Sequence, residues 1–332
     1  MTAPSGSTGP SDSPDSSDSP SSPPSFRSGF VAVVGRPNVG KSTIVNRILG
    51  TKVTITSPRP NTTRRTVRGV LHRSEVQAVF VDTPGLHRPR TALGERLNEH
   101  IDEALDDVDV VVAVVDATMA VGPGDRLVLE RAAHSARTSE SQGSLLVVVN
   151  KIDRARPAQV LERLAEAQKV VIATNSDAAD ADAADADATN PDSANGDAAS
   201  AEDTAEYFPI SAKTGEGIDT LVDAVLDRLP LGPPYFPEDM VSDVPEAFWV
   251  AELVREQLLA RMTEELPHSI ACRVTEWEWP RIRVEVVVER ESQKAMVIGK
   301  DGSILKAVGT AVREQLPPGA FLELHVSVDK RW

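Results

Sequence analysis

The stretch FVAVVGRPNVGKSTIVNRIL (residues 30–49) runs from a valine-rich segment, through a turn with two glycines, into a helix-forming segment. Its pattern G-x-x-x-x-G-K-S places Gly35 and Gly40 where the backbone can curl closely around an anion, with successive N–H groups pointing inward. The helix expected over 42–49 presents the positive end of its dipole to the same anion. The stretch therefore predicts a strand, a phosphate-binding loop and a helix.

Side chains at the end of this loop fit a nucleotide and its metal ion. Lys41 is predicted to reach the β- and γ-phosphates, and the Ser42 hydroxyl is predicted to ligate Mg²⁺. Thr43 follows directly and belongs to the same predicted binding site. A strand before the loop and a helix after it are the context that this motif requires.

Further valine-rich segments at 76–82, 109–116 and 144–150 are separated by stretches long enough for helices. Continuous apolar strands of this kind are typical of a parallel sheet covered on both faces. We therefore expect an α/β fold class, with a P-loop domain built on a mostly parallel sheet over residues 29–229.

Polar residues follow the first of these strands, in the order Asp82-Thr83-Pro84-Gly85. The Asp82 carboxylate suits Mg²⁺, through a bridging water, and the Gly85 N–H suits the γ-phosphate. Both residues are therefore predicted to face the phosphate-binding loop.

The base is read, on this interpretation, by two later motifs. Asn150-Lys151-Ile152-Asp153 follows a strand, and the Asp153 carboxylate can accept hydrogen bonds from guanine N1–H and N2–H₂. Adenine lacks that pair of donors, so ATP would leave a buried carboxylate unpaired. Lys151 can lie over the base, and Asn150 can tie this loop to the phosphate loop. Ser211-Ala212-Lys213 offers a backbone N–H to guanine O6, and GTP or GDP is the predicted ligand.

The segment TITSPRPNTTRR (54–65) is polar and broken by prolines, so it is predicted to be a loop. Thr62 and Thr63 resemble the threonine that completes the Mg²⁺ shell when GTP is bound, and Thr63 is favoured. The alternative is ordinary loop polarity. Lys41, Thr63 and Gly85 are thus the predicted catalytic residues.

Position 86 carries a leucine, where many GTPases have a glutamine that orients water, so slow intrinsic hydrolysis is expected. The neighbouring His87 is a weaker candidate for a base, because loop histidines are usually only solvated. Asn38 resembles the residue with which potassium-stimulated GTPases hold a monovalent ion. A turn-forming asparagine is the alternative reading.

Composition divides the remainder of the chain. Residues 1–28 are rich in Ser, Pro and Asp and predict a disordered tail, and an Ala/Asp-rich insert at 174–206 is predicted to be disordered as well. The net charge of −15 resides mostly in these two segments, so it does not exclude a nucleic-acid partner. No apolar run reaches the ~18 residues of a membrane span. The single cysteine, Cys272, excludes an internal disulfide and favours a reducing cytoplasm.

After a proline-rich linker at 230–245, residues 246–332 read as helix, strand, strand, helix, turn, helix, strand. Gly299 and Gly302 flank Lys300 and Asp301 between the second and third helices, in the manner of the GXXG loop of a type II KH domain. Such a turn lets backbone groups sit against nucleic-acid phosphates. The alternative is a helix-capping turn without a ligand. The predicted RNA-binding residues are Lys294, Gly299, Lys300, Gly302 and Lys306.

Nearby aromatic and basic residues are assigned different roles. Arg281, Arg283 and Trp332 are expected to assist RNA binding. Trp277 and Trp279 are expected to be structural, because aromatic residues favour half-buried sheet positions.

The combined motifs resemble the Era family of bacterial GTPases over about residues 29–332, through the segments GRPNVGKST, NTTRR, DTPGLH, NKID, SAK, FPED, AELVREQLL, ELPHSI and VIGKDG. The resemblance implies binding of the 3′ region of 16S rRNA and assistance to 30S subunit assembly. It also implies a cytoplasmic protein with peripheral association with the cell membrane, and a monomer is expected. The tail and the insert depart from the family pattern, and the chain stops at Trp332, where relatives usually continue.

Two other functions remain open. A tRNA-modification GTPase would require a catalytic cysteine or a cofactor domain. Cys272 lies in a predicted strand, and the sequence shows no cofactor domain beside it. A membrane-signalling GTPase would use the C-terminal domain for protein contacts, although no lipidation motif ends the chain.

Overall fold

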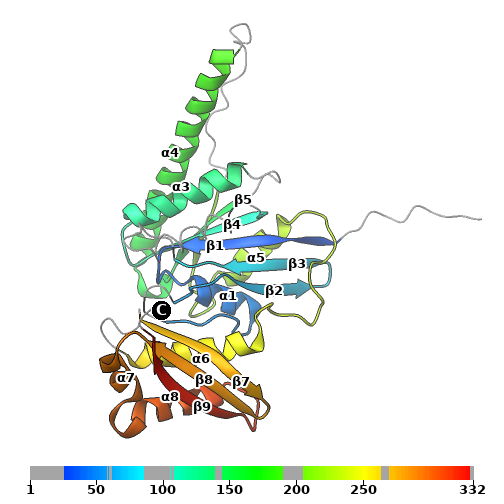
Figure 1. Cartoon of the computed structure of the whole chain (residues 1–332). Helices are drawn as coiled ribbons and strands as arrows, with labels where there is room; N and C mark the ends of the chain where they lie inside the picture. The colour runs from blue at the N-terminus through cyan, green and yellow to red at the C-terminus, as the bar shows by residue number, and fades with distance from the viewer. Residues whose placement is uncertain are drawn as a thin grey trace, which may run out of the picture.

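The computed structural model describes residues 26–57, 59, 62–85, 105, 108–138, 144–189, 205–262 and 269–329. These residues form a six-stranded sheet flanked by helices and a separate three-stranded sheet. Figure 1 shows the smaller sheet below the larger one, with helix α6 (Glu246–Arg261) between them.

The larger sheet has the strand order β2–β3–β1–β4–β5–β6, and only the pair β2–β3 is antiparallel. Its strands are β1 (Arg27–Gly35), β2 (Val67–Arg73), β3 (Val76–Asp82), β4 (Val110–Asp116), β5 (Ser144–Asn150) and β6 (Glu206–Ile210). The four predicted strands are β3, β1, β4 and β5, which are neighbours in this order. The expected mostly parallel sheet is confirmed.

Both faces of this sheet are buried, because alternate residues of each strand enter two separate apolar cores. Helices α1 (Lys41–Leu49) and α5 (Ile218–Asp227) pack on the core that contains Val31 and Val33. Helices α3 (Pro123–Thr138) and α4 (Pro157–Thr189) pack on the core that contains Ala32 and Val34. The carboxyl ends of the parallel strands therefore open onto one edge, where ligands bind in sheets of this type.

Helix α4 is longer than composition suggests. The sequence predicts a disordered insert over 174–206, whereas α4 continues to Thr189. Alanine is the strongest helix former, and its frequency here outweighs the weak propensity of the interleaved aspartates. Residues 190–204 lie outside the described part of the chain, as do residues 1–25 of the predicted tail. Within the described ranges, no helix is both long and apolar enough to cross a membrane.

The predicted linker is attached to the larger sheet rather than free. The side chain of Gln77 on β3, which is fully buried, donates to Phe236 O at 2.8 Å and accepts from the N–H groups of Tyr235 (2.7 Å) and Phe236 (3.0 Å). Further along, Ser242 Oγ donates to Arg68 O at 2.7 Å and Val70 N–H donates to Val241 O. The linker therefore follows the β1–β3–β2 side of the sheet.

Replacing Gln77 by alanine should lower the free energy of unfolding by about 1–3 kcal/mol, because it leaves linker N–H groups without an acceptor in a part-buried setting. Urea unfolding followed by circular dichroism measures this change. As a control, Gln257→Ala removes only a contact within α6, with Arg261, and should shift stability by less than about 0.5 kcal/mol. Equal stability of the Gln77 variant and the parent would contradict the anchoring role.

The C-terminal residues form a second, smaller unit. Strands β7 (Ile270–Glu278), β8 (Arg281–Val288) and β9 (Phe321–Val328) make a sheet in which β7–β8 is antiparallel and β8–β9 parallel. Helices α6, α7 (Glu291–Ile298) and α8 (Ser303–Arg313) cover this sheet, around a core that includes Val297 and Val308. The predicted order of helices and strands is confirmed.

Candidate nucleotide and RNA sites

The phosphate-binding loop lies between β1 and α1, at the open edge of the sheet. Gly40 has φ 108°, and a Cβ at this position would lie 2.3 Å from Asn150 Nδ2. A Cβ at Gly35 would lie 2.7 Å from Val114 O. Close contacts therefore exclude a side chain at both positions, and the left-handed backbone at Gly40 favours glycine there as well.

Lys41 is folded into this loop. Its Nζ donates to Gly35 O at 3.0 Å and to Arg36 O at 3.1 Å, and only 6% of the residue is exposed. Burial lowers the pKa of Lys41 to about 8, although the nearby Asp82 carboxylate opposes the shift. A phosphate anion in the loop would favour the charged form, as the predicted role requires.

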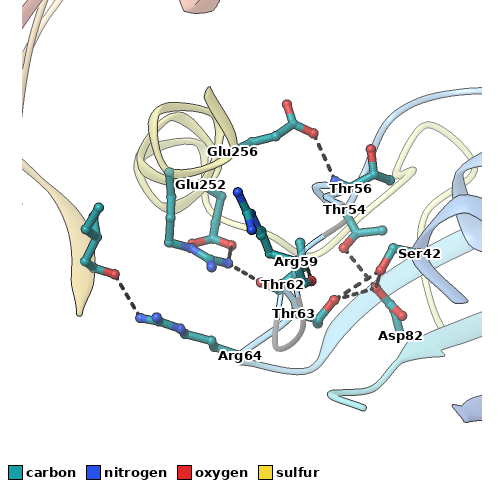
Figure 2. A network of polar contacts seen from close by, with 12 residues as sticks. Ser42, Thr54, Thr56, Arg59, Thr62, Thr63, Arg64, Asp82, Glu252 and Glu256 are labelled. Carbon is teal, nitrogen blue, oxygen red and sulfur yellow. Dashed lines mark hydrogen bonds and ion pairs between the residues drawn. The ribbon is translucent and has the colours of Figure 1, made fainter. Parts of the chain in front are cut away.

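Three hydroxyl groups converge on the buried carboxylate of Asp82, as Figure 2 shows. Asp82 Oδ2 accepts from Ser42 Oγ (2.8 Å), Thr54 Oγ1 (2.9 Å) and Thr63 Oγ1 (3.3 Å). Its Oδ1 has no hydrogen-bond partner among the described residues, and burial raises the pKa of this carboxyl. Oxygen ligands around a fully buried carboxylate with an unsatisfied atom fit a hard cation such as Mg²⁺.

The structure separates the two candidate threonines. Thr63 lies 3.1 Å from Ser42 Oγ at the carboxylate cluster, whereas Thr62 Oγ1 donates to Arg59 O in a turn. Thr54 reaches the same cluster, and sequence analysis missed it because one threonine in the alternating segment Val53–Thr56 matches no motif. Only the burial of Val53 and Ile55 hints that Thr54 has a fixed position.

A cavity of about 340 Å³ opens beside these groups. Gly85 borders it, and a Cβ at Gly85 would lie 2.6 Å from the backbone nitrogen of Pro37, so this strand end abuts the phosphate loop. The cavity is lined by Pro37, Asn38, Gly40, Lys41, Ser42, Thr43, Thr56, Ser57, Thr62, Thr63, Gly85, Lys151 and Arg154. Leu86 and His87 lie outside the described residues.

Asn150 joins three loops at one end of the cavity. Its Nδ2 donates to Val39 O at 2.8 Å in the phosphate loop, and its Oδ1 accepts from Ala212 N–H at 3.0 Å. The Ala212 N–H is therefore already engaged, although the sequence suggested a backbone donor from this segment for guanine O6. Arg47 on α1 also holds this segment, through the carbonyls of Ala212 and Lys213.

Lys151 lines the cavity, whereas Asp153 is not among the described residues that line it. Lys151 Nζ donates to Asn38 O at 2.6 Å and to Asp116 Oδ2 at 2.7 Å, a partner that sequence analysis did not identify. Asp153 is exposed, and its Oδ1 accepts from Ser211 Oγ at 2.7 Å. The hydroxyl orients the carboxylate and leaves it open to a ligand.

The GXXG turn links α7 to α8. Gly299 (φ 74°), Asp301 (φ 53°) and Gly302 (φ 74°) all have left-handed φ values, and Gly302 caps α8. A Cβ at Gly299 would meet Ile304 at 2.7 Å, whereas one at Gly302 would meet nothing within 4 Å. The turn is therefore tightly packed on its inner side and open at Gly302.

The charged residues around this turn differ in whether they are already engaged in ion pairs within the protein. Lys300 and Lys306 are exposed and Lys294 is half-buried, and none of the ion pairs among the described residues involves them. Arg281 and Arg283 are instead paired with Glu323, at 2.6 Å and 3.1 Å. Their predicted help to RNA binding is thereby reduced.

The expectation of a half-buried sheet position is wrong for Trp279, which lies in the β7–β8 turn and is 53% exposed. Trp277 lies near the end of β7, as expected, and is 37% exposed. The β-bulge after Val274 shifts the register of β7. The alternation of side chains along a regular strand therefore does not predict which residues are exposed beyond the bulge. Trp332 lies beyond the described residues.

Two family models match the chain. Residues 30–175 match the model described as "50S ribosome-binding GTPase", and residues 265–332 match a KH domain model. The first match includes the phosphate loop and the Asp153 motif, and the second includes the GXXG turn.

Individual relatives are similar over nearly the whole length. "GTPase Era" of Mycobacterium avium (strain 104) is 40% identical over 318 residues, which cover 92% of this chain and 95% of the relative. "GTPase Era" of Mycobacterium tuberculosis (strain ATCC 25618 / H37Rv) is 40% identical over 319 residues, with the same coverage.

Solved structures extend the similarity to three dimensions. A crystal structure of Era in complex with MgGDPNP and nucleotides 1506–1542 of 16S ribosomal RNA is 34% identical, with a TM-score of 0.74 over 92% of this chain and 95% of that chain. A substituted Era of Aquifex aeolicus bound to GDP and AlF4⁻ is also 34% identical, with a TM-score of 0.71 and the same coverage. The similarity therefore includes both sheets.

Proposed function

The chain belongs to the Era family of GTPases, and on that premise we propose that it binds the 3′ region of 16S rRNA and assists 30S subunit assembly. One chain carries a phosphate-loop pocket and a GXXG turn, and this pairing is the observation that supports the proposal. The proposed GTPase domain spans 29–229 and the proposed RNA-binding domain spans 246–332.

The nucleotide roles follow from the positions of the side chains. Lys41 would leave its backbone acceptors to neutralise the β- and γ-phosphates, and the Gly85 N–H would face the γ-phosphate. Ser42, Thr63 and Asp82 would hold Mg²⁺, which neutralises developing charge during phosphoryl transfer. Asp153 would accept from the guanine edge, while Asn150 keeps its loop against the phosphate loop.

RNA binding should depend on the bound nucleotide. In GTPases of this class, the γ-phosphate orders the loops at the pocket, and its loss releases them. The protein with GDPNP bound should therefore have a higher affinity for an oligonucleotide with the 3′-end sequence of 16S rRNA than the protein with GDP bound. Filter binding with each nucleotide measures this difference. Equal affinity in the two states would reject the switch, and no binding in either would reject the RNA partner.

Potassium is proposed as an additional ligand through Asn38. This residue lines the cavity and has a left-handed φ of 67°, and Gly40 of the same loop also has a positive φ. GTP hydrolysis should be about tenfold faster in KCl than in NaCl, equivalent to roughly 1.4 kcal/mol of transition-state stabilisation. The Asn38→Ala variant should lose this difference, and a parent enzyme indifferent to the cation would refute the site.

Cellular placement follows the family premise: we propose a monomer in the cytoplasm that associates peripherally with the cell membrane. A tRNA-modification chemistry through Cys272 is not supported, because burial raises the pKa of this thiol to about 12 and suppresses the nucleophilic thiolate.

A further inference from the structure

The described residues of the 52–64 loop (52–57, 59 and 62–64) are held from two sides. Toward the pocket, the Thr54 and Thr63 hydroxyls donate to Asp82, and the Thr56 and Ser57 residues line the cavity. On the opposite side, the same loop contacts helix α6 and the start of β7, as Figure 2 shows. Contacts with both domains therefore hold the loop in its position over the pocket.

Glu256 makes the central contact on the α6 side. One carboxylate oxygen accepts from Thr56 N–H at 2.9 Å, and the other pairs with Lys52 Nζ at 2.5 Å. Only 7% of Glu256 is exposed. A buried carboxylate is unfavourable unless it is paired and hydrogen-bonded, so this residue depends on the loop for its partners.

Arg255 holds the other end of the loop. Its guanidinium donates to Thr62 O, the carbonyl next to Thr63, and Arg255 Nε donates to Glu252 at 2.7 Å. Arg255 is 2% exposed, so these contacts take the place of the hydrogen bonds that its guanidinium would make to water. The backbone beside Thr63 is therefore fixed by a residue of the other domain.

Additional contacts extend the connection. Arg64 Nη1 donates to Ile270 O at 2.9 Å, and Arg59 donates to Met262 O at 2.9 Å. Lys52 Nζ also donates to Gln315 Oε1 at 2.7 Å, just beyond the carboxyl end of α8. Because α8 begins at the GXXG turn, one rigid helix lies between that turn and the loop.

We propose that Glu256 and Arg255 are positioning residues that hold the 52–64 loop over the magnesium site, so that the C-terminal domain raises affinity for GTP relative to GDP. This inference rests on the proposed function of the pocket. Thr63 would contribute to binding only when a γ-phosphate and Mg²⁺ are present. Loosening the loop should therefore lower the affinity for the triphosphate and leave the affinity for GDP unchanged. By linkage, RNA bound at the C-terminal domain changes affinity for GTP through the same contacts.

The test compares nucleotide affinities of full-length variants. Glu256→Gln preserves shape but removes the charge paired with Lys52, and Lys52→Met removes the pair from its other side. Each should weaken binding of GDPNP with Mg²⁺ by about tenfold, within the usual range of coupling between sites, and leave GDP affinity unchanged. Titration with fluorescent nucleotides gives both constants. The double variant should lose less than the sum of the two single losses, because both changes break the Glu256–Lys52 pair.

The matched control is Glu285→Gln, which breaks an ion pair with Arg273 in the same domain, away from the loop. It should alter neither affinity. Circular dichroism establishes whether each variant is folded. If Glu256→Gln does not fold, Lys52→Met still tests the proposal, because Lys52 is at a half-buried position. An unchanged ratio of GDPNP to GDP affinity in a folded variant would overturn the proposal.

The nucleotide measurement is independent of RNA. If the parent protein binds no rRNA oligonucleotide, the assembly function fails while the role of Glu256 is still decided by the affinity ratio. If the parent binds RNA but Glu256→Gln leaves the ratio unchanged, the positioning role fails and the assembly function stands.

Discussion

Asp153→Asn is expected to weaken GTP binding by about a thousandfold and to create affinity for xanthosine triphosphate. The carboxylate of Asp153 is oriented by Ser211 and accepts from two guanine donors in the proposed complex. An asparagine amide would place a donor against the guanine amino group, and sites built on hydrogen bonds reject such mismatches by large factors. Xanthine carries a carbonyl in place of that amino group, so the amide can pair with it.

The experiment measures dissociation constants for GTP, ATP and xanthosine triphosphate with parent and variant. The parent should bind GTP and neither of the others. Retained GTP affinity in the variant, or ATP affinity in the parent, would show that Asp153 does not read the base. Asp219→Asn, on α5, is the control, because it makes the same acid-to-amide change at an exposed carboxylate in the first turn of that helix.

Gly302→Asp combined with Lys300→Glu is expected to lower RNA affinity by at least about a hundredfold. The two changes replace a cation and a bare turn with carboxylates where phosphates are expected, and each lost phosphate contact also lowers the salt dependence. The φ of 74° at Gly302 strains any side chain, but a Cβ there meets nothing within 4 Å, and Asp adopts left-handed backbone more readily than most residues. Gly299 is unsuitable for this purpose, since its Cβ would strike Ile304.

Gly319→Asp provides a matched control for this variant. Gly319 has φ 93° and open space around its Cβ, and it precedes β9 at the other end of α8. Filter binding should show normal RNA affinity for Gly319→Asp and normal GDP affinity for both variants. If the turn variant binds RNA as well as the control, the GXXG turn is only a helix connection.

The sequence predicted where the loops around the cavity lie, because their glycines and carboxylates follow strand ends at fixed spacing. Gly40 and Asn150, more than a hundred positions apart in the chain, are close neighbours because the loop that follows β1 meets the carboxyl end of β5 at the same edge of the sheet. The turn at Gly299–Gly302 was predictable for a similar reason, since local conformation requires glycine there.

Residues that act between the domains could not be found in this way. A charged residue such as Glu256 in a helical pattern is normally read as solvent-exposed, and only the packing of α6 against the 52–64 loop reveals its burial. Thr54 was missed because its role depends on a contact with Asp82, which lies at the end of β3, far away in the sequence. The α4 extension was misread because composition alone does not distinguish an alanine-rich helix from an alanine-rich coil.

Attachment of the linker to the β1–β3–β2 side has a mechanical consequence. Ser242 is still bonded to β2, and α6 begins at Glu246, so the tether between the anchored chain and the second domain is three residues long. Such a segment reaches roughly 10 Å when extended. If the second domain were to separate from the loop, this short tether would keep it nearby, so re-docking would be an intramolecular event at high effective concentration.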